Sequence, residues 1–90
     1  LAASQQEVAD RFAGRGGLKG AARYEGASWF ELITGSPALQ GALACVDCEV
    51  ARVVEHASHA LIFGTVRAVV VSGEPAPALV YAHGRYKSVE

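Results

Sequence analysis

Two long stretches with β-strand patterning, joined by a short connection, constrain the fold of this chain most. Residues 43–55 alternate between apolar and polar side chains, as a strand with one covered face does. Residues 60–72 are richer in β-branched side chains and nearly continuous in apolar character, which predicts a strand buried on both faces. Residues 56–59 connect the two, so we expect a hairpin. Alternation in the first strand places Val46, Cys48, Val50 and Val54 on one face and Asp47, Glu49 and Glu55 on the other.

A short helix is predicted near the N-terminus. Ser4 and Glu7 have the spacing of a capping box, in which the Ser4 side chain accepts from the amide three residues on and Glu7 reaches back. Apolar side chains then recur at helical spacing on one face, with Phe12 as the core-facing residue. Gly14 is suited to end the helix, because glycine adopts a left-handed conformation at little cost. The glycine-rich residues 14–20 indicate a loop.

The remaining segments are shorter. Residues 21–39 show no regular period, and residues 35–37 have the composition of a turn. A second turn over 73–77 precedes a strand at 78–82, and a last extended piece follows Gly84. One helix followed by antiparallel strands predicts a mainly β fold with one or two short helices, arranged as a small barrel or sandwich.

Composition excludes several classes of protein. Of 90 residues, 51% are hydrophobic and 19% charged, too apolar and too weakly charged a chain for intrinsic disorder. Two cysteines cannot staple a miniprotein. A net charge of −1 gives no general attraction to nucleic acid or to an anionic membrane, and no apolar run is long enough to cross a bilayer. The cytoplasm is therefore the expected location.

The apolar content also predicts a covered surface, because a domain of this size leaves much of its surface exposed. We expect either a homo-oligomer or a further segment that packs on these residues. The chain starts at Leu1 and contains no methionine, so we expect residues upstream of Leu1.

Cys45 and Cys48 have a C-x-x-C spacing, but residues three apart on a strand point to opposite faces. Two thiols placed in this way cannot easily bind one zinc ion or form a disulfide. We therefore interpret both as small buried residues.

Two further sets of residues have the types needed for a metal site or a hydrolase triad, but their arrangement in the sequence supports neither. His56 and His59 have an H-x-x-H spacing without a third ligand, so no metal site is predicted. Ser36, His59 and Asp47 are the residue types of a hydrolase triad, but no nucleophile motif positions them.

The start of the predicted helix is a candidate phosphate site. A helix N-terminus offers free amides and the positive end of a dipole, and Ala3, Ser4 and Gln5 could add a hydroxyl and a carboxamide. The alternative is that Ser4 only caps the helix, which from the residues alone is the more common situation.

Four blocks in this order and spacing resemble the flavin reductase-like family with the FMN-binding split β-barrel. They are Leu1–Gln5 with Ala9–Ala13, Trp29 with Thr34–Pro37 and Leu39–Ala44, His59–Val66, and Pro77–Tyr81 with Gly84–Tyr86. The resemblance is greatest to the short NAD(P)H:flavin reductases of two-component monooxygenases. It covers essentially the whole chain but only about the C-terminal half of the family's domain. Residues 1–90 are thus expected to be the C-terminal portion of one domain whose N-terminal strands are missing.

The resemblance implies roles for five residues. Ala3, Ser4 and Gln5 fall where the family contacts the ribityl-phosphate side of the flavin. His59 matches the family histidine near the nicotinamide dinucleotide, and Tyr86 belongs to a C-terminal motif close to the same site.

The activity implied by the resemblance is hydride transfer from NADH or NADPH to FMN or FAD. The protein would mainly orient two rings, so no catalytic acid is required. Reduced flavin would pass to a separate oxygenase component, and a homodimer is expected. Two alternatives remain open: a non-catalytic flavin-binding or dimerising split barrel, and a structural or regulatory domain without cofactor.

Overall fold

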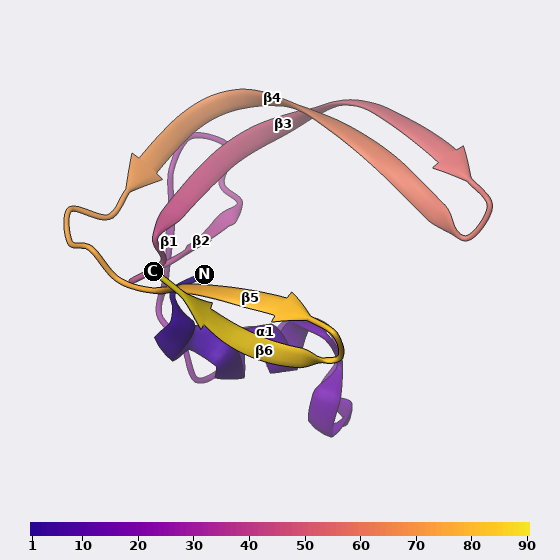
Figure 1. The fold of residues 1–90 in the computed structure, drawn as a ribbon. Coiled ribbons are helices and arrows are strands. Elements are labelled where there is room, and N and C mark those ends of the chain that lie inside the picture. The colour runs from indigo at the N-terminus through magenta and orange to yellow at the C-terminus, as the bar shows by residue number, and fades with distance from the viewer.

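The computed structural model describes residues 1–90, which form three antiparallel β-hairpins and a short helical segment (Figure 1). The strands are β1 (Trp29–Glu31), β2 (Pro37–Leu39), β3 (Ala44–His56), β4 (His59–Val71), β5 (Ala78–Ala82) and β6 (Arg85–Val89). They pair as β1–β2, β3–β4 and β5–β6. The predicted mainly β fold with short helices is confirmed. No helix has the length and apolar character needed to cross a membrane.

The helical segment begins with a 3-10 turn, η1 (Ala3–Gln5), and continues as α1 (Gln6–Phe12). Two further 3-10 turns follow, η2 (Arg15–Gly17) and η3 (Gly20–Tyr24), within and after the predicted loop. Gly14 adopts φ 83° directly after the helix and its amide donates to the carbonyl of Arg11, so the predicted helix end is confirmed.

The predicted Ser4–Glu7 capping box is wrong. Ser4 lies inside the 3-10 turn, and it is the Gln5 side chain that caps the turn, its Oε1 accepting from the Ala2 amide at 3.0 Å. The cause is long-range, because Ala2 forms a β-bridge with Ala78 that keeps it extended. The chain can therefore begin to turn only after Ala2.

The predicted long hairpin is confirmed, with β3 and β4 beginning and ending within one residue of the expected bounds. It forms a ribbon that arches away from the other elements and ends at the 57–58 turn (Figure 1). The pairing register shifts twice, leaving one extra residue in β4 at Arg67 and one in β3 at Ala51.

The second β-bulge corrects the predicted faces of β3. Val50 pairs with Gly64, whereas Val53 pairs with Ile62, and these two β4 residues lie on the same face. Val53 therefore continues the face of Val46 and Val50, and the expectations for Val54 and Glu55 were wrong because they assumed unbroken alternation. We call this surface the apolar face; its large side chains are Val46, Val50, Val53, Ile62, Val66, Val69 and Val71.

The expectation that β4 is buried on both faces is also wrong in this chain. Large side chains of the apolar face are 52–69% exposed. On the other side of the ribbon, Leu61 and Phe63 are 56% and 53% exposed. The cause is that β3 and β4 pair only with each other. The solvent-accessible surface of the chain is 6605 Å². A compact protein of the same mass exposes roughly 5,000 Å², so about 1,600 Å² more surface is accessible here.

Covered residues lie where the short elements meet. Ala2, Ala38 and Leu39 are buried together with one charged residue, Asp47. Strands β1 and β2 were not predicted, because three residues each are too few to show a period.

Aromatic packing joins α1 to the segments that follow it. The Phe12 ring lies 4.9 Å from Tyr24 and 5.7 Å from Trp29 between ring centroids, and the Trp29 indole donates to the Tyr24 carbonyl at 2.9 Å. The prediction that Phe12 faces the interior agrees with this packing, although its side chain is still 38% exposed.

Residue 64 of the ribbon has no room for a side chain larger than that of glycine. A Cβ built on Gly64 would lie 2.8 Å from the Cβ of Cys48, which sits too close to the backbone to move aside. We expect Gly64→Ala to lower the free energy of unfolding by about 1–3 kcal/mol, as overpacking does. Gly73→Ala is the matched control, since nothing lies within 4 Å of its Cβ position. Urea denaturation followed by circular dichroism measures both, and equal stability of the two variants would contradict the assignment.

Candidate functional site

A polar cavity of about 340 Å³ lies against the start of the helical segment. Ser4, Gln5 and Arg11 line one side of it, and Ser28 and Gln40 contribute from the segments around β1 and β2. Two of the three residues predicted to contact flavin thus line a common cavity with several hydrogen-bonding groups. Ala3 lies beside them in η1.

Ala3, Ser4 and Gln5 differ in which of their hydrogen-bonding groups remain available to a ligand. The Ala3 amide donates to the Pro77 carbonyl at 2.8 Å. The Gln5 carboxamide is used at both ends, since its Oε1 accepts from Ala2 and its Nε2 donates to the Gln40 carbonyl at 3.1 Å. The exposed Ser4 hydroxyl makes no hydrogen bond within the chain, so it remains available. Gln5 accordingly shapes the cavity, and Ser4 presents a free donor and acceptor to it.

His59 does not line this cavity and lies at the turn end of the β3–β4 ribbon. It is the first residue of β4, pairs with His56 at the end of the ribbon, and is exposed. Its Nδ1 lies 3.0 Å from the Ser58 hydroxyl. In Figure 1 the end of the ribbon points away from α1, so this chain by itself does not bring His59 to the helix start.

Tyr86 lies on β6 and packs against the helical segment. Its ring centroid is 5.1 Å from that of Tyr81, and the Arg15 guanidinium carbon lies 5.5 Å from the Tyr86 ring. Burial raises the pKa of the Tyr86 hydroxyl, and Asp10 beside it raises the pKa further. Tyr86 thus joins the β5–β6 hairpin to α1 and η2, and it does not line the polar cavity.

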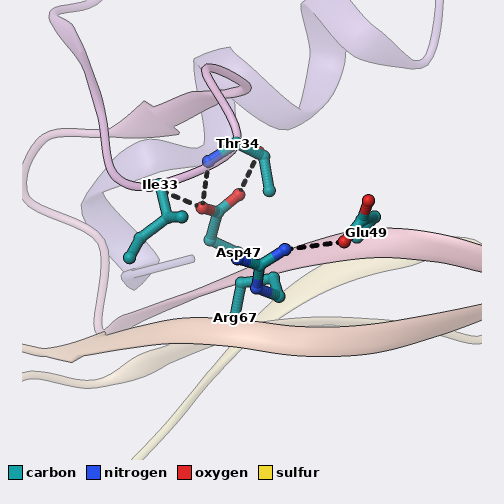
Figure 2. Close-up of polar contacts among 5 residues, drawn as sticks. All are labelled: Ile33, Thr34, Asp47, Glu49 and Arg67. Carbon is teal, nitrogen blue, oxygen red and sulfur yellow. Dashed lines mark hydrogen bonds and ion pairs between the residues drawn. The ribbon is translucent and has the colours of Figure 1, made fainter.

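The most extensive side-chain hydrogen bonding in the chain is around Asp47 (Figure 2). This carboxylate accepts from the amides of Ile33 and Thr34 at 2.8 and 2.9 Å and from the Thr34 hydroxyl at 2.5 Å. The bond from the Thr34 hydroxyl is the main cause that holds the pKa of Asp47 below its ordinary value of 3.8, and Arg67 also lowers it. Arg67 in turn donates to Glu49 at 2.7 Å.

Asp47 therefore fastens the 32–36 loop to β3. The sequence placed it correctly on the face opposite the valines but did not predict its burial. A usable signal was present, because an acidic residue can accept from the free amides of a nearby Thr-Gly turn.

A second, apolar cavity of about 550 Å³ lies between α1 and β3. The aromatic cluster of Phe12, Tyr24 and Trp29 lines it, as do Leu39 and Asp47. It lies at the base of the ribbon and adjoins the few buried residues. An apolar, aromatic-lined cavity of this size is suited to a ring system or to the packing of further side chains.

Cys45 and Cys48 are free thiols that both line this cavity. The Cys45 thiol points to the Leu39 carbonyl at 3.6 Å, whereas Cys48 lies beside Gly64 across the ribbon. Cys45 is half-buried, but Cys48 is exposed, so the interpretation of both as buried residues is wrong for Cys48. No group of three or more metal-ligating side chains is present.

Ser36, His59 and Asp47 are not assembled into a triad. The Asp47 carboxylate is occupied by Ile33 and Thr34, and His59 lies at the end of the ribbon.

Comparison with known proteins identifies the class. Residues 1–90 match the family described as "Flavin reductase like domain", and the chain belongs to this family. It is 35% identical over 92 residues to the reductase subunit HsaB of a flavin-dependent monooxygenase from Mycobacterium tuberculosis (strain ATCC 25618 / H37Rv), covering 100% of this chain and 46% of HsaB. It is likewise 35% identical over 89 residues to the FMN reductase (NADH) RutF 1 of Methylorubrum extorquens (strain PA1), covering 99% of this chain and 43% of the relative.

Solved structures confirm the fold. Nitrilotriacetate monooxygenase component B from Mycobacterium thermoresistibile superposes with a TM-score of 0.85 at 31% identity, covering 100% of this chain and 49% of that one. The chain spans about half the length of the curated relatives it matches. The expected membership of the split-barrel flavin reductases is confirmed, with the three hairpins forming part of that fold.

The hydrogen bonds of Asp47 predict how stability depends on pH. Because the folded pKa of Asp47 is depressed, its contribution is complete above the unfolded value near 3.8 and is lost as pH falls through the folded pKa. We expect Asp47→Asn to be less stable at pH 7 and to lose less on acidification below pH 4 than the unchanged protein. Urea midpoints measured between pH 7 and pH 3 test this. Glu74→Gln, which alters an exposed carboxylate with no partner, serves as the control; an equally flattened profile there would count against Asp47.

Proposed function

We propose that the protein is an NAD(P)H-dependent flavin reductase that transfers hydride to FMN or FAD and supplies reduced flavin to a separate monooxygenase. The observation that carries this proposal is the family match along all 90 residues. Relatives at 35% identity are named as a monooxygenase reductase subunit and as an FMN reductase using NADH. The second of these names favours NADH as the reductant. The expected cytoplasmic location stays a prediction.

The chain's own residues fit the phosphate side of a flavin nucleotide. The polar cavity offers the free Ser4 hydroxyl, and Gln5 is held rigidly by two hydrogen bonds beside it. Flavin and nicotinamide supply the hydride chemistry when bound, so the protein's task is to bind and orient them.

We further propose that residues 1–90 form the C-terminal portion of one domain. The twofold greater length of the relatives supports this, as do the exposed side chains of Leu61 and Phe63 on the side of the ribbon opposite the apolar face. In the complete domain, His59 and Tyr86 would contact the nicotinamide dinucleotide near the flavin. The separation of His59 from the polar cavity favours keeping the second candidate, a flavin-binding or dimerising split barrel without reductase activity.

Hydride transfer is tested by NADH oxidation. We expect the protein to oxidise NADH in the presence of FMN at a rate well above that of an enzyme-free control, followed by the loss of absorbance of NADH. His59→Ala should raise KM for NADH several-fold and leave FMN affinity unchanged, because His59 is proposed to contact only the dinucleotide.

His56→Ala is the matched control, since His56 pairs directly with His59 at the same exposed end of the ribbon. Equal effects of the two substitutions would remove the proposed role of His59. An FMN-binding protein with no NADH oxidation would favour the non-catalytic candidate.

We also propose a homodimer, supported by the apolar face of the ribbon. Its side chains are more than half exposed and it carries no charge between Val46 and Ile62 on that side. We expect sedimentation velocity to show a dimer that Val50→Lys dissociates, because a charge there would be desolvated in the interface. Thr65→Lys, on the opposite side of the same ribbon, should leave the dimer intact. A monomer at tens of micromolar protein would disprove the proposal.

A further inference from the structure

Two histidines face each other at the turn end of the ribbon. His56 is the last residue of β3 and His59 the first of β4, and the register pairs them directly across the 57–58 turn. Side chains directly opposite in an antiparallel pair lie on the same face of the sheet, with Cβ atoms about 4.5–5.5 Å apart. The H-x-x-H spacing did not reveal this arrangement, because it is the turn that brings the two imidazoles together.

Both imidazoles are accessible to a ligand. The two side chains are exposed, and neither forms an ion pair. Their one polar contact within the chain joins His59 Nδ1 to the Ser58 hydroxyl, with 3.0 Å between the atoms. When Nδ1 carries the proton and donates it to Ser58, the lone pair of His59 Nε2 remains available. This is the arrangement of metal-bound histidines, whose second ring nitrogen usually donates to a neighbouring oxygen.

The ligand atoms on this face are suited to a transition-metal ion. Imidazole nitrogen binds Zn²⁺ at about 2.0–2.1 Å, a distance at which two opposed histidines can bind one ion. The nearest carboxylate in sequence is Glu55, which pairs with Ala60 and lies on the other face. The next pair on the histidine face, Val54 with Leu61, is apolar. Because no carboxylate lies beside the histidines, the pair does not suit Mg²⁺ or Ca²⁺, which need oxygen ligands.

We propose that His56 and His59 together bind one Zn²⁺ ion at the turn end of the ribbon, with water completing the coordination. No third ligating side chain joins the pair. The site is therefore exchangeable, unlike structural zinc sites, which use four protein ligands. Binding of the ion does not rest on the proposed function. Its consequence does, because a Zn²⁺ ion on the His59 ring would compete with the dinucleotide that His59 is proposed to contact.

Titration with zinc chloride, followed by the NMR signals of the histidine ring nitrogens, tests the binding directly. We expect the signals of His56 and His59 to shift together and to saturate below millimolar zinc, while magnesium chloride leaves them unchanged. His83 is the internal control, because it is an exposed histidine in the β5–β6 turn with no histidine opposite it.

Substitution of one ligand should weaken the site strongly. His56→Ala and His59→Ala should each lower zinc affinity by about tenfold or more, since even the loss of a group that only orients a ligand costs roughly 10–100-fold in metal affinity. His83→Ala should leave the affinity unchanged. The site is overturned if His56 and His59 shift no more than His83, if they titrate independently, or if zinc binds only at the free thiols of Cys45 and Cys48.

NADH oxidation separates this proposal from the reductase proposal. Zinc should lower the rate of the unchanged protein, and His56→Ala should lose most of this inhibition relative to its own zinc-free rate. If zinc binds both histidines but NADH is not oxidised even without zinc, the reductase proposal fails and the zinc site stands. If zinc binds and oxidation proceeds at the same rate, the proposed contact of His59 with the dinucleotide is overturned and the zinc site stands.

Discussion

The backbone pairing of the first three residues with the start of β5 determines how the rest of the N-terminal half is arranged. Leu1 accepts from the Leu79 amide, Ala2 bridges Ala78, and Ala3 donates to Pro77. These bonds keep the chain extended up to Ala2, so the 3-10 turn starts at Ala3 and the polar cavity forms beside it. The helix thereby lies close to the β5–β6 hairpin, and Tyr86 fills the contact between them.

Local patterns predicted the parts of the fold whose stabilising contacts are local. Strands β3 and β4 are 13 residues each, long enough for their patterning to show, and their turn is short. Strands β1 and β2 were missed because three residues carry no period. The faces of β3 were predicted correctly up to Val50, after which the bulge at Ala51 shifts the alternation. A bulge depends on both strands, so one strand's pattern cannot reveal it.

The candidate site was predictable only in part, for a related reason. The resemblance drew attention to Ala3, Ser4 and Gln5, and the chain does place Ser4 and Gln5 on one cavity. Which of these groups stay free for a ligand depends on residues distant in sequence. The Gln40 carbonyl accepts from the Gln5 side-chain amide, and the Pro77 carbonyl accepts from the Ala3 backbone amide. Asp47 shows the same limit. Its burial depends on the 33–34 amides, which lie thirteen and fourteen residues away in sequence.

The separation between the polar cavity and the end of the ribbon has a physical consequence for any two-ligand reaction. Hydride transfer requires the two rings to be in contact, so groups that bind their outer ends are expected to lie apart. Under the proposed function, Ser4 at the polar cavity would contact the phosphate end of the flavin, whereas His59 at the end of the ribbon would contact only the far portion of the dinucleotide. The stacked rings would then lie between Ser4 and His59. Between these two places, the side chains of the ribbon and the apolar cavity beside the aromatic cluster are not covered by packing within the 90 residues.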